Sequence, residues 1–193
     1  MHLIKRIYRA IRSRYLLSKY PDYPIKGHLS RIEGAELSHI VRKNQSKKII
    51  EIGSFLGRST NFIGMNKDEH DELHCLDTWQ NDAMSDGNWD TYQTFLDNTK
   101  DLKNITIHRG YSREFESKFN DKSVDILFVD ADHSYEGCKE DIDNFFPKVK
   151  SGGIVVFHDY GNPCGVKQAV DESVANKCQS YYLSGSMFVG VVA

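Results

Sequence analysis

The sequence predicts an α/β protein in which helices cover both faces of a doubly wound, seven-stranded sheet that is mostly parallel and carries an antiparallel C-terminal hairpin strand. Two observations lead to this fold class. Short runs rich in Ile, Val and Phe recur along the chain, and helix-length segments separate the first five of them. The last two runs are separated by little more than Gly185 and Ser186, which requires a hairpin.

Residues 1–26 form a basic N-terminal helical extension ahead of this sheet. Apolar residues recur at helical spacing up to Lys19, and Pro21 and Pro24 end the helix. The helix contains basic residues but no acidic one: Lys5, Arg6, Arg9, Arg12, Arg14 and Lys19. We expect it either to pack on the domain or on a second subunit, or to rest weakly on an anionic membrane surface. It lacks the continuous apolar stretch and the cleavage site of a secretory signal.

The remaining elements follow in order. Ile32, Leu37, Ile40 and Val41 mark a second helix that runs to about Lys43. The strand candidates are the runs 47–53, 72–77, 104–110, 124–132, 152–160, 179–184 and 187–193, with helices expected at 59–68, 87–100 and 135–149. We expect the hairpin to place its antiparallel strand at the edge of the sheet. No linker or repeat interrupts the pattern, so residues 1–193 are expected to form a single domain.

Composition excludes several classes of protein. A chain of 193 residues with 39% hydrophobic and 27% charged residues is neither disordered nor collagen-like. Its mean hydropathy is -0.53, and it has no apolar run of roughly 18 residues, so no transmembrane segment is expected. A net charge of -2 gives no basic field that would attract nucleic acid. The four cysteines form no CxxC pair, which favours reduced thiols in a cytoplasmic protein.

In a parallel sheet, ligands bind beyond the carboxyl ends of the strands, so the residues that follow each strand are the candidates for chemistry. After the first strand, the sequence EIGSFLGRST runs through a glycine-containing turn into a helix. Its candidates are Glu51, Gly53, Ser54, Gly57 and Ser59, because the glycines let the backbone approach a ligand and the helix amides point toward it. The stretch lacks the GxGxxG spacing of a dinucleotide fingerprint, and a purely structural turn is the alternative.

The second and third strands end in further candidates. Asp77, followed by Thr78 and Trp79, can accept two hydrogen bonds from the hydroxyls of a ribose, or it is a solvated loop residue. Gly110, Tyr111 and Ser112 follow the third strand and can border a flat base. An ordinary turn is the simpler explanation of that last segment taken by itself.

The fourth and fifth strands end in acids and histidines. Asp130, Asp132 and His133 follow the fourth strand, and His158 and Asp159 follow the fifth. The spacing from Asp130 to His158 leaves room for one crossover helix, so adjacent strands would bring both groups together. Converging carboxylates and imidazoles are ligands for a divalent cation, whereas uncompensated acids would raise one another's pKa. A cluster of surface acids and histidines without function is the alternative.

Taken together, these segments resemble the class I S-adenosylmethionine-dependent methyltransferases over residues 27–193. Macrocin-type sugar O-methyltransferases are the most similar branch, with catechol and caffeoyl-CoA O-methyltransferases more distant. EIGSFLGRST is similar to the family's first cofactor motif, LDTW to its ribose-binding acid and HRGYSREF to its adenine-side turn, and VDADHSYEGCKEDIDNFFPKVKSGGIVVFHDY is the most specific part of the resemblance. The resemblance implies a Rossmann-like sheet of seven strands with a final antiparallel hairpin.

The resemblance also implies a set of residues that holds S-adenosylmethionine. The cofactor-binding candidates are Glu51, Gly53, Ser54, Gly57, Ser59, Asp77, Thr78, Trp79, Gly110, Tyr111, Ser112 and Asp130. Within this set, Trp79, Tyr111 and Ser112 would surround the adenine ring.

In the relatives, Mg²⁺ is held by the acid that ends the fourth strand and by an Asp-Asn or Asp-Asp pair that ends the fifth. The matching residues here are Asp130, His158 and Asp159, so His158 departs from the pattern. Imidazole is a poorer ligand for Mg²⁺ than for Mn²⁺, Zn²⁺ or Fe²⁺, so either the metal differs or His158 acts as a base. His133 matches the residue taken as the general base, with Asp130 beside it in the catalytic set, and Asp132 is an alternative positioning residue for His133.

The implied reaction is transfer of a methyl group to a hydroxyl of a small molecule, with a saccharide or glycoside favoured by the relatives. A sugar hydroxyl is nearly un-ionised at neutral pH, so either a metal (Mg²⁺ or Mn²⁺) bound to its oxygen must ease loss of the proton or the His133 base must accept that proton. The alternatives are a metal-dependent hydrolase, a dinucleotide-dependent dehydrogenase and a binding module without turnover. The acceptor is expected to contact the N-terminal helices, residues 80–100 and the loop 160–168, with residues 80–89 a candidate cover. A homo-oligomer remains open.

Overall fold

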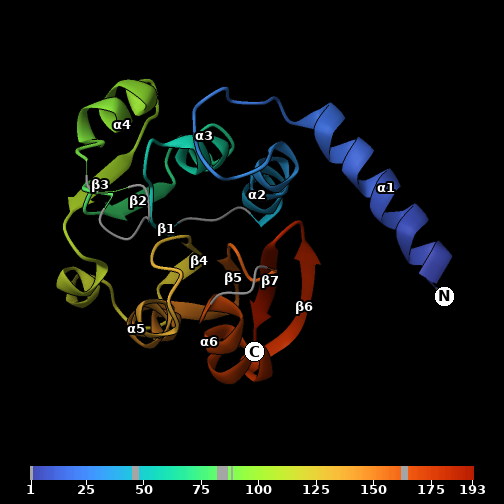
Figure 1. Cartoon of the computed structure of the whole chain (residues 1–193). Helices are drawn as coiled ribbons and strands as arrows, with labels where there is room; N and C mark the ends of the chain where they lie inside the picture. The colour runs from blue at the N-terminus through green and yellow to red at the C-terminus, as the bar shows by residue number, and fades with distance from the viewer. Residues whose placement is uncertain (1, 45–47, 82–86, 88, 162–164) are drawn as a thin grey trace.

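Seven strands form one sheet in the order β3-β2-β1-β4-β5-β7-β6 (Figure 1). The structure is a computed structural model that describes residues 2–44, 48–81, 87, 89–161 and 165–193. The strands are β1 (Lys48–Ile52), β2 (Glu72–Asp77), β3 (Ile105–Arg109), β4 (Val124–Val129), β5 (Val149–Phe157), β6 (Cys178–Ser184) and β7 (Met187–Val192). The predicted fold class is therefore confirmed.

The predicted antiparallel hairpin forms one edge of the sheet. Strands β1 to β5 run parallel, and β7 runs antiparallel to both β5 and β6. The predicted hairpin is present, but β7 pairs with β5 inside the sheet and β6 forms the edge. Within the hairpin the more apolar strand takes the interior place: Met187, Phe188 and Val189 are buried, whereas Tyr181 and Leu183 of β6 are exposed.

Helices cover both faces of the sheet, as predicted (Figure 1). On one face lie α2 (Arg31–Asn44), α3 (Arg58–Gly64) and α4 (Tyr92–Thr99), and on the other lie α5 (Tyr135–Phe145) and α6 (Gly165–Ser173). Each face has its own apolar core. The first contains Phe62 and Phe95, and the second contains Ile142 and Val170. Because both faces are covered, the central strands are mostly apolar, and every residue of β4 except Asp125 is buried.

The predicted helices are present but shorter than expected. The helix predicted at 59–68 ends at Gly64, and the Lys67 ammonium then donates to the carbonyl of Asp71 at 2.7 Å within the turn that leads into β2. The helix predicted at 87–100 begins at Tyr92, whose backbone N–H donates to the Asp90 carboxylate at 2.8 Å. α5 ends at Phe145 and Phe146–Lys148 follow as a 3-10 turn, because Pro147 has no N–H for the next α-helical hydrogen bond.

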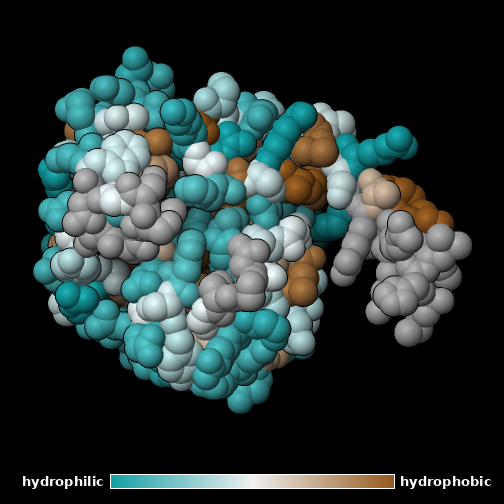
Figure 2. All heavy atoms as spheres, viewed as in Figure 1, coloured by the Kyte–Doolittle hydropathy of each residue, from teal (hydrophilic) through white to brown (hydrophobic). Residues whose placement is uncertain are grey.

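α1 (His2–Lys19) projects from the body of the molecule beside α2 and β6 (Figure 1). Its C-terminal half packs on α2, where Leu16 and Tyr20 are buried against Ala35. The space-filling view shows the same segment extending away from the rest of the surface (Figure 2). None of the helices among the described residues combines the length and the apolar content that crossing a bilayer would need.

Candidate active site

The strand order reverses between β1 and β4, and the loops after these two strands enclose two adjoining cavities. The larger cavity, of about 290 Å³, lies on the side of β2 and β3. The smaller cavity, of about 90 Å³, lies on the side of α3 and of the segment that precedes α2. Gly53 and Ala131 line both cavities, so the two form one continuous site. A reversal of strand order is the usual place for ligands in an open parallel sheet.

Gly53 allows the loop after β1 to pass directly over the loop after β4. Its φ is 86°, and a Cβ atom added there would lie 1.9 Å from the carbonyl oxygen of Asp130. Any other residue at this position would therefore displace the wall shared by the two cavities.

Asp77, at the end of β2, joins the loops that border the larger cavity. Its carboxylate accepts the backbone N–H of Phe55 at 2.7 Å and that of Trp79 at 2.6 Å. Asp77 and Thr78 both line the cavity. Because each carboxylate oxygen can accept a second hydrogen bond, Asp77 can position these loops and still bind a hydroxyl group in the cavity.

Several loop residues at the strand ends have unusual backbone conformations. Six described residues other than glycine have positive φ; two of them, Asn104 and Lys122, precede β3 and β4, and the other four are Phe55, Trp79, Asn81 and Asp159, with values of 46°, 54°, 55° and 55°. All four lie in the loops after β1, β2 and β5. Strained residues of this kind are common in binding sites, where the surrounding structure holds them in place.

Glu51 lies behind the loop after β1 and lines neither cavity. It is fully buried and accepts hydrogen bonds from Ser54 Oγ at 2.8 Å and Thr60 Oγ1 at 2.6 Å. Burial raises the pKa of the Glu51 carboxyl against the opposing effect of these hydroxyls. Ser54 and Ser59 line the smaller cavity, so they reach a ligand from a different side than Asp77 does.

Trp79 does not border a cavity, in contrast to the prediction that it surrounds adenine. Its ring is fully buried in the core, 4.7 Å from the ring of Phe95 and 5.3 Å from that of Tyr92 between centroids. The positive φ of Trp79 reverses the chain direction at the end of β2. The indole consequently packs beneath the site instead of facing it.

The turn after β3 borders the larger cavity, which is lined by its residues Gly110, Tyr111 and Ser112. The hydroxyl of Ser112 donates to the Asp141 carboxylate of α5 at 2.5 Å. Asp141 is itself nearly buried and lines the same cavity, and burial raises its pKa to about 6. Asp132 also lines this cavity, and its carboxylate accepts the backbone N–H of Ser134 at 2.8 Å.

His158 is held between three carboxylates. Its Nδ1 atom lies 3.1 Å from Asp130 Oδ1 and 3.1 Å from Asp159 Oδ2, and its Nε2 atom lies 3.5 Å from Glu33 Oε2. Burial alone would lower the pKa of His158, but the three acids raise it to about 12. Burial alone would also raise the pKa of Asp130, but His133 and His158 lower it to about 2. His158 is therefore a buried imidazolium whose two nitrogens both face acids.

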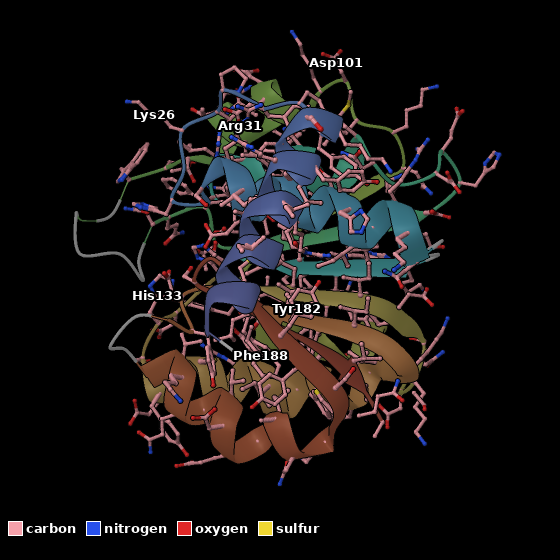
Figure 3. The ribbon with its side chains drawn as sticks, turned by 90° about the vertical axis from the view of Figure 1, so that its right-hand side faces the viewer. Lys26, Arg31, Asp101, His133, Tyr182 and Phe188 are labelled. Atoms are coloured by element: carbon pink, nitrogen blue, oxygen red, sulfur yellow. The ribbon has the colours of Figure 1, made fainter. Side chains whose placement is uncertain are left out.

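His133 faces the same acids from the smaller cavity. Its Nε2 atom lies 3.3 Å from Asp159 Oδ2 and 3.5 Å from Asp130 Oδ1, and its side chain is partly exposed. The hydrogen bond to Asp130 raises the pKa of His133. Figure 3 shows His133 at the margin of the molecule, at the strand ends. Asp132, the alternative positioning residue, faces the larger cavity instead.

The residues that could share a metal ion differ from those expected. Among the described residues, Asp130, His133 and Asp159 bring one ligand atom each within 4.8 Å of one another. We call these three the DHD cluster. His158, which the sequence placed among the metal ligands, is not part of this group. Both nitrogens of His158 already face carboxylates, Nδ1 those of Asp130 and Asp159 and Nε2 that of Glu33.

The segment ahead of α2 forms the outer wall of the smaller cavity. The guanidinium of Arg58 donates to the backbone carbonyls of Tyr23, Ile25 and Leu29, the latter two at 3.0 and 2.8 Å. His28 and Phe55 line the cavity, and the Trp89 ring packs edge-on against Phe55 at 5.8 Å. The smaller cavity thus has an aromatic side and an ionisable side.

Three residues of the site were not singled out in the sequence. Arg58 lies within the first motif, but nothing in the sequence indicates that it binds carbonyls of residues 23–29. Asp141 lies in the middle of a helical pattern. Glu33 follows Ser30 by three residues, and the two form a capping box at the start of α2, with Ser30 N–H donating to Glu33 at 2.9 Å. That spacing predicts the start of a helix but gives no indication that Glu33 also contacts His158.

Some predicted features fall on residues outside those described. These are residues 82–86 and 88 of the candidate cover, and residues 162–164 of the candidate acceptor loop. Cys164 belongs to the latter, while Cys75, Cys138 and Cys178 form no disulfide with one another.

Comparison with known proteins agrees with this architecture. A family model described as a methyltransferase domain matches residues 50–160. A protein of Sinorhizobium fredii named y4gI is 29% identical over 131 residues, which cover 65% of this chain but only 14% of that protein. The chain therefore spans about a seventh of the length of this relative.

Solved structures share the fold. A Klebsiella pneumoniae protein solved under the name of an O-methyltransferase superposes with a TM-score of 0.72 at 16% identity, covering 94% of this chain and 96% of that one. The O-methyltransferase TomG of Streptomyces achromogenes, involved in tomaymycin synthesis and solved with S-adenosylmethionine, superposes with a TM-score of 0.67 at 16% identity, covering 86% and 82%.

Proposed function

Because the chain belongs to the methyltransferase domain family whose model matches residues 50–160, we propose that it methylates a hydroxyl group of a small cyclic molecule, with S-adenosylmethionine as the donor. One observation carries the proposal. The two cavities share Gly53 and Ala131, and Asp130 and His133 of the DHD cluster line the smaller cavity beside them, where an acceptor would face a donor held in the larger cavity.

The larger cavity is the proposed donor site. Asp77 would accept hydrogen bonds from the ribose hydroxyls, while Ser112 and Asp141 border the place of the base. Tyr111, with the Arg113 guanidinium 4.3 Å from its ring centroid, offers a planar surface at the mouth of this cavity. These contacts would hold the sulfonium methyl group toward the smaller cavity, and such alignment lowers the barrier by up to roughly 7 to 11 kcal/mol.

The smaller cavity is the proposed acceptor site, with His133 as the base. The acceptor oxygen attacks the methyl carbon, the bond from that carbon to sulfur breaks, and its electron pair neutralises the sulfonium. Because Nε2 faces the two carboxylates, the hydroxyl proton passes to the other ring nitrogen of His133, Nδ1, during this displacement. Asp130 and Asp159 would stabilise the imidazolium that forms, since both lie within 3.5 Å of Nε2.

A divalent cation at the DHD cluster is a second form of the same site. The donor set fits one, since two carboxylates and an imidazole converge there. The imidazole favours Mn²⁺, Fe²⁺ or Zn²⁺ over Mg²⁺. When bound, such an ion would lower the pKa of the acceptor hydroxyl. Asp130, His133 and Asp159 would hold the cation, and His158 would remain beside them as a fixed positive charge.

The acceptor class is proposed from the resemblance and from the lining of the cavity. The macrocin-type relatives suggest a saccharide or glycoside hydroxyl. His28 and Phe55 line the smaller cavity with aromatic rings 6.2 Å apart between centroids, and the Trp89 ring packs edge-on against Phe55. Such surfaces pack against the C–H face of a sugar ring and also against a phenol, so the proposal at this level is a ring-shaped acceptor.

The test is a screen of activated sugars and phenols for release of S-adenosylhomocysteine, with and without a chelator. His133→Asn should lower turnover by about 10² to 10⁴, while the exposed His70→Asn serves as the matched control and should leave it unchanged. Loss of activity with chelator and recovery with Mn²⁺ would assign the cation form, and indifference to chelator would assign the base.

Two outcomes of this screen would contradict the proposal. Acceptor hydrolysis without S-adenosylmethionine would identify the metal-dependent hydrolase. Donor binding without turnover of any acceptor, together with unchanged behaviour of His133→Asn, would identify a binding module.

A further inference from the structure

α1 turns an apolar face away from the molecule. Ile7, Ile11 and Tyr15 are 52%, 63% and 50% exposed, and their spacing of four residues places them along one side of the helix. The space-filling view shows brown, hydrophobic surface on this projecting segment (Figure 2). An amphipathic surface helix normally directs such a face at its own domain. Among the described residues, Tyr15 packs edge-on against His39 of α2, with 6.2 Å between the ring centroids, whereas Ile7 and Ile11 remain exposed.

A different side of α1 holds it on the body. Leu16 and Tyr20 are buried against Ala35 of α2. The guanidinium of Arg12 forms an ion pair with Glu36 and lies 5.5 Å from the ring centroid of Tyr182 in β6. Figure 3, which looks onto this side, shows α1 crossing in front of the sheet above Tyr182. These contacts fix the orientation in which Ile7, Ile11 and Tyr15 face outward.

The charge of α1 is opposite to that of the rest of the chain. α1 contains six of the 25 Lys and Arg residues and none of the 27 Asp and Glu residues. Among its basic residues, Arg14 and Lys19 are exposed beside the apolar face. The remainder of the chain is therefore acidic, and the basic charge is concentrated on the element that exposes apolar side chains.

We propose that α1 binds an anionic lipid surface, lying in its plane with Ile7, Ile11 and Tyr15 inserted at the boundary of headgroups and acyl chains. An exposed apolar stripe flanked by Arg and Lys is the pattern that such surfaces bind, and tyrosine is suited to their interface. α1 is not apolar enough to cross the bilayer.

A second copy of the chain fits this face less well than a lipid surface does. Packing two α1 helices against each other would bring two helices together that each carry six basic residues and no acid. Like charges at this density oppose association, whereas an anionic surface attracts both the charge and the apolar stripe.

The experiment is co-sedimentation of the full chain with vesicles of phosphatidylcholine, with and without about one third phosphatidylserine. We expect binding to the anionic vesicles only, weakening as NaCl rises from about 0.1 to about 0.5 M because salt screens the attraction. The double variant Ile7→Glu, Ile11→Glu should bind at least about ten-fold more weakly. Arg14→Gln and Lys19→Gln should each weaken binding about five-fold.

Met65→Glu is the matched control, because Met65 is equally exposed, at 54%, but lies at the end of α3; its binding should not change. Circular dichroism and the Tm of each variant verify that it is folded, which we expect since Ile7 and Ile11 are exposed. Equal binding to both kinds of vesicle, or none to either, would overturn the proposal. So would a dimer in light scattering that Ile7→Glu, Ile11→Glu converts to a monomer while wild type ignores the vesicles.

Discussion

His158 Nε2, at the end of β5, lies 3.5 Å from Glu33 Oε2 on α2, so a buried ion pair ties the N-terminal helices to the strand ends. Glu33 also accepts the backbone N–H of Ser186 at 2.6 Å in the turn between β6 and β7. One carboxylate therefore fixes three segments that are far apart in the sequence. The site is a product of the whole sheet and of α2, and not of the strand-end motifs alone.

Glu33→Gln should destabilise the protein. The substitution removes the negative charge opposite His158, and its single amide oxygen can accept from Ser30 or from Ser186 but not from both, as the two carboxylate oxygens do. Breaking a buried charge pair costs about 3 to 5 kcal/mol when one partner is left unpaired. Because Asp130 and Asp159 still face His158, we expect about 1 to 3 kcal/mol, measured by urea unfolding. Glu69→Gln, which removes an exposed ion pair with Lys103, is the control and should leave the midpoint unchanged. An unchanged midpoint for Glu33→Gln would show that the pair contributes nothing.

Asp141→Asn should change the pH dependence of stability. The native pKa of Asp141 is raised from 3.8 to about 6 by burial, so this carboxyl stabilises the fold below pH 4 and loses that contribution as the pH rises through 6. Asparagine keeps an acceptor for Ser112 without the titration. The difference in unfolding free energy between the variant and wild type should therefore grow in favour of the variant from pH 4 to 7, by about 2 to 3 kcal/mol. A constant difference across this range would mean that Asp141 has an ordinary pKa.

Gly53→Ala should abolish donor binding. The added Cβ would meet the Asp130 carbonyl oxygen at 1.9 Å, and the positive φ adds strain of about 1 to 3 kcal/mol. Gly152→Ala separates the two effects, because Gly152 has a φ of 77° and no heavy atom within 4 Å of the added Cβ. We expect the control to bind S-adenosylmethionine normally despite its strain. Normal binding by Gly53→Ala would place the donor elsewhere.

Trp79→Phe should leave the affinity for the donor unchanged. The Trp79 ring packs in the core, and its buried Nε1 has no hydrogen-bond partner, so phenylalanine loses volume but also removes an unsatisfied donor. We expect a loss of about 1 to 2 kcal/mol in unfolding free energy, with the dissociation constant for S-adenosylmethionine unaltered in calorimetry. A large loss of affinity at unchanged stability would instead support the predicted contact between Trp79 and adenine.

The sequence was sufficient to predict the residues that the strand ends bring together. Apolar runs stop at Asp77, Asp130 and His158, and the parallel pairing of Val129 with Phe157 places Asp130 beside His158, as the spacing implied. These predictions succeed because parallel strands that end together must deliver their next residues to one edge of the sheet.

The contacts that determine each side chain's role were not predictable. The capping box with Ser30 is sufficient to explain a glutamate at position 33. The pairing of Glu33 with His158 becomes apparent only when α2 lies against the end of β5. The direction of the Trp79 ring depends on a positive φ that tryptophan rarely adopts. β7 and not β6 pairs with β5, because β7 has more apolar surface to bury inside the sheet. The length of the hairpin loop does not predict which of the two strands takes that place.

Isothermal titration of the full chain with S-adenosylmethionine tests most directly whether the two cavities are a donor site and an acceptor site. Wild type should bind one equivalent. Asp77→Ala should bind far more weakly, because it loses the acceptor in the larger cavity and both backbone contacts that shape it. His133→Ala should bind as wild type does, since His133 lines only the smaller cavity. Failure of wild type to bind, or equal affinity of Asp77→Ala, would contradict the assignment.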